Sequence, residues 1–245
     1  MHWSDEAIIL STVKYGESSG IITTLTKEHG LYKGLVRGIA SKKNCGIYQI
    51  GNHIDASWRG RLSEHLGNFT AELKTPNAAL LMHCPIRLSA LNCICTILET
   101  TLAERETAGN IYYHLSSFIE HLKNDEHWQL YYILLEVELL SHLGFRLDLS
   151  SCAATGETSD LIYISPKSGR AVSAAAGEPY KNKLLIMPPF LKEGHDRQYD
   201  PSHIVNGLDI GLYFLEKYIY KPHNKVIPVA RMRFADLLKE QASPN

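Results

Sequence analysis

Four basic side chains follow one another closely in the first quarter of the chain, at Lys33, Arg37, Lys42 and Lys43. The segment 31–39 is predicted to be a strand, and side chains two positions apart in a strand point to the same face. Lys33 and Arg37 therefore share one face, while Lys42 and Lys43 follow the end of the strand. Cations at this spacing suit a polyanion, and the phosphate backbone of nucleic acid is held by such groups.

Other residues of the same region extend this pattern. Arg59 and Arg61 follow a predicted strand at 53–58, and Lys74 belongs to the same set of strands. Nucleic-acid-binding barrels combine such cations with aromatic side chains that stack on bases. Three aromatic residues are available for stacking, although the sequence does not orient them: Tyr32, Tyr48 and Trp58.

Charge alone favours a simpler interpretation, in which these cations are solvated and keep a strand face soluble. The formal net charge of the whole chain is only −1. Its distribution is uneven, with +2 over residues 1–75, −5 over residues 76–150 and +2 over residues 151–245. An acidic middle between mildly basic ends is consistent with a local binding face but does not establish one.

The cysteines and the catalytic motifs point away from a metal centre and from an enzyme. Cys93 and Cys95 are two residues apart on a predicted helix, where their side chains diverge, and Cys152 has no second cysteine nearby. No nucleophile elbow, phosphate-binding glycine loop or zinc-binding His-Glu-x-x-His motif is present in the sequence. We therefore expect a non-enzyme that needs no cofactor.

The same composition predicts a cytoplasmic location and no membrane partner. The five cysteines are an odd number without framework spacing, which is typical of a reducing compartment. The first residues are acidic and do not resemble a signal peptide. The most apolar stretch, 130–143, is interrupted by glutamates and is too short to span a membrane.

Two kinds of periodicity divide the chain. Five short β segments are predicted in the first part, at 7–13, 21–26, 31–39, 53–58 and 69–73. Five strands in about seventy residues fit a small closed barrel, of which the OB-fold is the common nucleic-acid-binding type; an SH3-like barrel fits the same pattern.

After Thr75-Pro76 the apolar residues recur at helical spacing. The predicted helical runs are 86–98, 111–122, 130–143, 204–219 and 228–239. A β-hairpin is predicted at 161–165 and 170–173, around the turn Pro166-Lys167-Ser168-Gly169, and residues 174–200 are predicted to be irregular. The expected fold class is α+β, with an OB-fold barrel at 1–76 and a helical domain with an inserted hairpin at 77–245.

Three segments together resemble one known family. They are GLYKGLVRGIASKK at 30–43, LLSHLGFRLDLSSC at 139–152 and ISPKSGRAVS at 164–173. Their order along the chain resembles the bacterial RecO family of recombination mediators, and the resemblance covers nearly the whole chain. The succession of the three segments carries the resemblance.

The resemblance implies an N-terminal OB-fold, a C-terminal helical domain and a role in DNA repair. Members bind single- and double-stranded DNA, anneal complementary strands and help to load RecA onto DNA coated with single-stranded-DNA-binding protein (SSB). The implied partners are RecR and the acidic, hydrophobic C-terminal tail of SSB. The family's basic barrel positions correspond here to Lys33, Arg37, Lys42 and Lys43.

Two departures from the family pattern are visible. Many members have a further basic residue where this chain has Ala40. Some members bind zinc through four cysteines, of which only Cys152 is present here. The resemblance therefore does not carry a zinc site to this chain.

The tail of SSB requires an apolar groove flanked by cations. Four residues near the end of the chain are candidates to line it: Lys217, Lys221, Arg231 and Arg233. An equally plausible alternative is that they are surface cations favoured near helix C-termini. At the level of the whole protein, the alternative to a DNA-binding mediator is an adaptor whose barrel binds another protein, which the acidic middle and the near-neutral total charge favour.

Overall fold

A computed structural model describes residues 1–61, 66–192 and 200–242. The chain forms two compact units, Met1–Asp125 and Glu126–Asn245, and each is described by itself. The first unit contains a β-barrel and three helices. The second contains the remaining helices and a small sheet. The strands give way to helices at Pro76, whereas the division between the compact units lies after Asp125.

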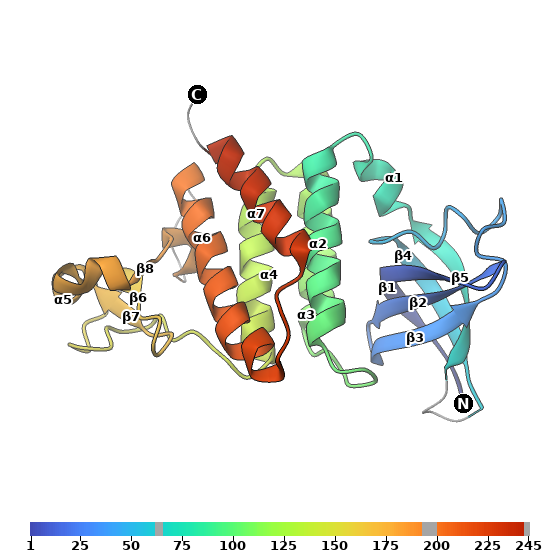
Figure 1. Cartoon of the computed structure of the whole chain (residues 1–245), viewed down its shortest axis with the longest axis horizontal. Coiled ribbons are helices and arrows are strands. Elements are labelled where there is room, and N and C mark those ends of the chain that lie inside the picture. Colours follow the sequence, from blue (N-terminus) through green and yellow to red (C-terminus); the bar gives the residue numbers. More distant parts are fainter. Residues whose placement is uncertain (62–65, 193–199, 243–245) are drawn as a thin grey trace. The chain divides into compact units, whose positions relative to one another are not determined.

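Five strands form a closed barrel in the first unit (Figure 1). They are β1 (His2–Tyr15), β2 (Ser19–Thr26), β3 (Gly30–Val36), β4 (His53–Arg59) and β5 (Gly67–Thr75). Hydrogen-bonded neighbours follow the order β1-β2-β3-β5-β4, and β4 pairs back to β1. All pairs are antiparallel except β3–β5. This arrangement confirms the predicted OB-fold.

The barrel closes where two glycines meet. Gly34 of β3 pairs with Gly67 of β5. A Cβ atom at Gly34 would lie 2.5 Å from the Phe69 ring, and one at Gly67 would lie 2.3 Å from the Trp58 ring. Only glycine therefore permits this approach of the two strands over the large aromatic side chains of the core.

The barrel interior is filled by alternate residues of the strands. Its buried members include Ala7, Ile9, Ile22, Tyr32, Val36, Ile54, Ala56, Trp58 and Phe69. Strand β1 changes its alternation at one point, because its register with β2 shifts between Ile9 and Ser11. Leu10 is the extra residue of this β-bulge. Beyond it, Thr12 rather than Val13 lies opposite the inward Ile22.

Three helices complete the first unit: α1 (Asn77–Leu81), α2 (Pro85–Thr101) and α3 (Ile111–Asn124). Helix α2 packs against β1, and its Glu99 accepts hydrogen bonds from the Ser11 and Thr23 hydroxyls. His53 lies in a buried network, with its Nδ1 3.1 Å from Asn77 Nδ2 and its Nε2 3.3 Å from Ser116 Oγ. Burial lowers the pKa of His53 below its ordinary value of 6.5.

The second unit is built on α4 (Trp128–His142), α6 (Pro201–Phe214) and α7 (Val229–Ala242). Helix α6 contacts both α4 and α7. It continues into a π-helical turn, η3 (Leu215–Tyr220), and a 3₁₀ turn, η4 (Lys221–His223). In the described part of the chain no helix is long and apolar enough to cross a membrane.

A small three-stranded sheet belongs to the same unit. The predicted hairpin is confirmed as β6 (Leu161–Ile164) and β7 (Ala171–Ser173). The prediction that 174–200 is irregular is wrong in part. That segment contains α5 (Ala174–Gly177), η1 (Glu178–Lys183), the third strand β8 (Leu185–Ile186) and η2 (Pro189–Leu191), whereas 193–199 lies outside the described residues.

Candidate nucleic-acid interface

The outer face of β1, β4 and β5 changes from basic to acidic along the strands. Partners in register lie on the same face, so three rows can be read across the sheet. One end carries His2, Arg59 and Asn68, and the opposite end carries Glu6, Asp55 and Glu72. The row between them is uncharged, with the Ser4 and Ser57 hydroxyls 2.7 Å apart. Only the first end suits a phosphate backbone.

Arg59 and Arg61 lie at that basic end. Together with Met1, His2 and Asn68 they line a hollow of about 710 Å³. Both arginines are exposed, and neither takes part in an ion pair among the described residues. The hollow is therefore open to an anionic ligand.

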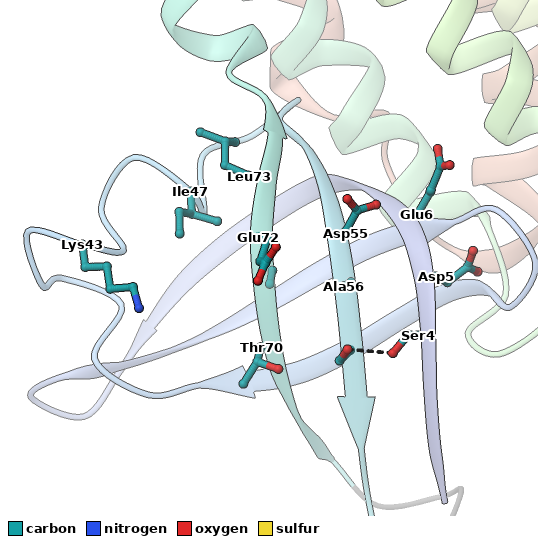
Figure 2. A pocket seen from close by; sticks show the side chains of 12 residues that line it. Ser4, Asp5, Glu6, Lys43, Ile47, Asp55, Ala56, Thr70, Glu72 and Leu73 are labelled. Atoms are coloured by element: carbon teal, nitrogen blue, oxygen red, sulfur yellow. Dashed lines mark hydrogen bonds between the residues drawn. The ribbon is translucent and has the colours of Figure 1, made fainter.

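The acidic end forms a second hollow, of about 750 Å³ (Figure 2). Figure 2 shows Lys43 reaching from the β3–β4 loop toward the strand that carries Thr70 and Glu72. Lys74 is held at the same end by Glu6, with Nζ 3.0 Å from Oε1. The hydrogen bond between the two side chains raises the pKa of Lys74 and lowers that of Glu6. The carboxylates of this part of the barrel repel phosphate, and Lys43 is the one cation proposed for DNA that lines it.

Lys33 occupies the outward position that the sequence predicts, but it has a counter-ion. Its Nζ lies 3.6 Å from Glu104 Oε2. The segment that carries Glu104 is fixed against the barrel, because the amide of Arg105 donates to the carbonyl of Leu31. Part of the charge of Lys33 is thus compensated within the first unit.

Arg37, Lys42 and Lys43 lie in the β3–β4 loop and are exposed. The prediction that the strand extends to Ile39 is wrong, because β3 ends at Val36 and Gly38 turns the chain with a φ of +63°. The loop is docked on the β1–β2 turn by the amide of Ile39, which donates to the carbonyl of Ser18 at 2.9 Å. No carboxylate of the described residues forms an ion pair with these three cations.

The six barrel cations therefore lie in three places rather than in one cluster. Lys33 lies on β3 beside Glu104, Arg59 and Arg61 lie at the end of β4, and the other three lie in the β3–β4 loop. In the rows across the sheet, Leu35 of β3 pairs with Asn68, which in turn pairs with Arg59. The outer surface of β3 and β5 thus connects the region of Arg37 with that of Arg59.

The three aromatic residues considered for base stacking do not reach the surface. Trp58 is buried in the barrel, where its Nε1 donates to the carbonyl of Lys33 at 3.2 Å, and Tyr32 and Tyr48 are also buried. The expectation that they are available to bases is therefore corrected: their size makes them core residues of a small barrel.

Two exposed apolar residues of β1 were not anticipated. Val13 and Tyr15 expose 60% and 59% of their surface, at the end of the strand beyond the Leu10 bulge. A strand with constant alternation would place Val13 on the same side as the buried Ile9. The bulge reverses this relationship, and no local sequence signal announces it.

Two candidate cations of the second unit, Lys217 and Arg231, are engaged in contacts within the unit. Lys217 donates to the carbonyl of Pro166 at 2.7 Å and lies 4.9 Å from the centre of the Tyr218 ring. Hydrogen bonding with Tyr218, and to a smaller extent with Tyr213, raises its pKa. Lys217 therefore fastens η3 to the turn of the small sheet.

Arg231 is fully buried, so the expectation that it lines an exposed groove is wrong. Its guanidinium pairs with Glu136 of α4, with Nη2 2.9 Å from Oε2, and also donates to the carbonyl of Leu208. Its position on the buried face of α7 decides this outcome. Lys221 and Arg233 are exposed, and Lys221 lies 3.4 Å from Glu216.

The cysteines provide no metal site in the described part of the chain, where no group of three potential ligands is found. Cys93 and Cys95 are buried in α2. Cys152 is also buried, and the amide of Ser173 donates to its Sγ at 3.3 Å. The neighbouring hydroxyl of Ser173, and then that of Thr155 and the Ser173 amide, lower the pKa of this thiol to about 6.

Comparison with known proteins gives consistent matches over the chain. Residues 1–76 match the family model described as "Recombination protein O N terminal", and residues 82–226 match "Recombination protein O C terminal". The "DNA repair protein RecO" of Mesorhizobium japonicum is 42% identical over 240 residues, covering 98% of this chain and 94% of that protein. A protein of the same name from Ruegeria sp. is 40% identical, covering 97% and 98% respectively.

Proposed function

The chain belongs to the recombination protein O family of DNA repair proteins, and we propose that it is a non-catalytic recombination mediator of the cytoplasm that binds DNA through its barrel. The observation that carries the proposal is the exposed group Arg37, Lys42 and Lys43, whose charges face no paired carboxylate among the described residues. Arg59 and Arg61 extend this basic surface across the barrel, and Lys33 supplements it when its pairing with Glu104 is exchanged for phosphate.

Titration of a fluorescent oligonucleotide at two salt concentrations tests the DNA site. Replacing Lys33, Arg37, Lys42 and Lys43 together by alanine is expected to weaken binding. The slope of the logarithm of the binding constant against the logarithm of the salt concentration is expected to decrease in magnitude by about 0.7 per lost phosphate contact with a single strand, or by about 0.9 with a duplex. A matched control removes four exposed lysines of the second unit: Lys167, Lys181, Lys183 and Lys225. Equal binding by the barrel variant and the wild type would reject the site.

A mediator of this kind anneals complementary strands and helps to load RecA onto DNA coated by SSB. Cations that hold the backbone leave the bases free to pair, and the spread of cations over three places gives two strands separate contacts. The annealing rate of two labelled complementary oligonucleotides is expected to fall in the barrel variant. RecA-dependent ATP hydrolysis on SSB-coated DNA, with RecR present, is the corresponding measurement of loading.

For the acidic tail of SSB, the second unit retains two exposed candidates, Lys221 and Arg233. Arg231 is excluded by burial, and Lys217 is held by the turn at Pro166. Binding of a labelled tail peptide to the double variant Lys221→Ala/Arg233→Ala tests this site. An affinity equal to that of the wild type would remove both residues from the proposal.

One observation favours an adaptor as the second candidate function. The acidic end of the barrel, with Glu6, Asp55 and Glu72, cannot take DNA and offers a surface for a protein. Capture of a partner that persists at high salt, without measurable oligonucleotide binding at moderate salt, would select the adaptor.

A further inference from the structure

An apolar stripe crosses the outer face of the barrel next to its basic loop; it is exposed at Val13 and Tyr15 and half-buried at Ile21 and Leu35. Val13 of β1 pairs with Ile21 of β2, and Ile21 pairs with Leu35 of β3. Their neighbours Thr12, Ile22 and Val36 lie inward or beside the core, so these three side chains point outward. Tyr15 follows Val13 on the same face, at the end of the strand.

The apolar stripe has polar or charged residues on both sides along the strands. Toward α2, the next outward row consists of Ser11, Thr23 and Lys33, where Glu99 and Glu104 engage the side chains. On the other side, Tyr15 pairs with Ser19, and the exposed Arg37 directly follows β3. The apolar stripe is therefore bounded by Lys33 and Arg37 along β3.

The stripe continues across the sheet into polar residues. Leu35 pairs with Asn68, Asn68 with Arg59, and Arg59 with His2. None of the six positions in this row, from Val13 to His2, carries a carboxylate. The carboxylate closest in sequence, Glu17, lies in the β1–β2 turn, outside the row. An apolar half beside a basic half suits a ligand with flat apolar groups on an anionic backbone.

We propose that Tyr15 and the stripe Val13–Ile21–Leu35 form a base-stacking surface, which makes the barrel select single-stranded over double-stranded DNA. The inference rests on the proposed DNA-binding function and deepens it. Neighbouring strands are about 4.8 Å apart, so the stripe spans roughly 10 Å, a width that suits two or three stacked bases. Arg37 and Lys33 hold phosphates on either side.

The selection follows from the accessibility of bases. In a duplex the faces of the bases are covered by their neighbours, so only the cations of the barrel make contact. A single strand can place its bases on Tyr15 while its phosphates reach the same cations. The tyrosine ring is the suitable platform because every base has a π-face, whatever its sequence.

Substitution of Tyr15 is expected to affect the binding of single-stranded and double-stranded DNA differently. Tyr15→Ala is expected to weaken the binding of a fluorescent single-stranded oligonucleotide about five- to 150-fold, the range for loss of one base–aromatic stack, and to change duplex binding less than about twofold. Tyr15→Phe keeps the ring and is expected to bind as the wild type does. Tyr180→Ala is the matched control, since Tyr180 is 61% exposed in the second unit.

A second measurement does not depend on how the variant folds. Irradiation of the wild-type protein with a strand containing 5-iododeoxyuridine is expected to form adducts that mass spectrometry maps to Tyr15. Adducts only at other residues, or equal weakening of both DNA forms by Tyr15→Ala, would overturn the inference. So would unchanged DNA binding together with loss of a protein partner, which would assign the stripe to protein docking.

The two proposals fail in different ways. If the fourfold barrel variant binds DNA normally, the proposed DNA site is rejected. If that variant loses DNA binding while Tyr15→Ala keeps its single-strand affinity, only the stacking surface is rejected.

Discussion

Arg37 and Arg231 are the same residue type in two regions of the molecule, with opposite environments. Arg37 is exposed in the β3–β4 loop, whereas Arg231 is enclosed in the second unit and pairs with Glu136. A buried guanidinium with its counter-ion holds helices together and is not offered to a ligand. An exposed one contributes little to stability and is available to phosphate. A buried cation therefore does not indicate a binding site, and an exposed cation indicates one most clearly where no carboxylate compensates it.

The largest effect is expected from removing the buried arginine, Arg231. Arg231→Ala leaves Glu136 buried without its partner, which is expected to cost roughly 3–5 kcal/mol of stability in the second unit. Hydrogen exchange of the α4 and α7 amides measures this loss. The double variant Glu136→Leu/Arg231→Met is expected to recover most of it. Protection equal to that of the wild type in Arg231→Ala would contradict the structural role.

A second prediction concerns a buried titratable group of the first unit. Because burial lowers the pKa of His53 in the folded chain, the unfolded chain binds more protons once the pH falls below about 6.5. The contribution of His53 to the free energy of unfolding is complete above that pH and is lost as the pH falls, by about 1.4 kcal/mol per pH unit at most. Urea unfolding at pH 7 and pH 5 is expected to show a smaller decrease for His53→Gln.

A smaller effect, on DNA binding, is expected from removing the exposed arginine, Arg37. Arg37→Ala is expected to weaken DNA binding about threefold at moderate salt. The dependence of the binding constant on salt is expected to decrease by the equivalent of about one phosphate contact. Arg233→Ala removes an equally exposed arginine of the second unit and is expected to leave DNA affinity unchanged. Similar losses in both variants would mean that total charge, rather than position, governs binding.

The smallest effect is expected from removing Glu104, the carboxylate that compensates the charge of Lys33. Glu104→Gln removes the counter-ion of Lys33 without changing the shape of the side chain. An exposed pair of this kind contributes about 0–1 kcal/mol, so DNA affinity is expected to increase up to about fivefold. Anisotropy titration of the same oligonucleotide measures it, with Glu120→Gln on α3 as the control. A decrease in affinity would show that Glu104 orders the site instead of competing for it.

The sequence predicts the fold well where local patterns decide it. Alternation and turn residues locate the five strands, and helical spacing locates α2, α3, α4, α6 and α7. The short elements α1 and β8 were missed, because five or fewer residues carry too little periodicity. Strand β3 was predicted three residues too long, since Arg37-Gly38-Ile39 continues its alternation while Gly38 already turns the chain.

The site was predictable in part. The outward position of Lys33 follows from alternation, but its pairing with Glu104 is a contact across 71 positions of sequence that no local pattern contains. Burial of Trp58 and Arg231 depends in the same way on packing between distant segments. The exposure of Val13 and Tyr15 depends on one irregular residue, Leu10, that propensity does not reveal.

The bulge at Leu10 reverses the alternation of inward and outward side chains in strand β1. Before it, the even-numbered residues Ser4 and Glu6 face outward, and after it the odd-numbered Val13 and Tyr15 do. Deleting Leu10 would therefore leave Ser11, Val13 and Tyr15 outward, whereas keeping Leu10 in regular alternation without a bulge would turn Thr12 and Lys14 outward in their place. The bulge at Leu10 therefore decides that Val13 and Tyr15, rather than Thr12 and Lys14, face outward at the end of the strand.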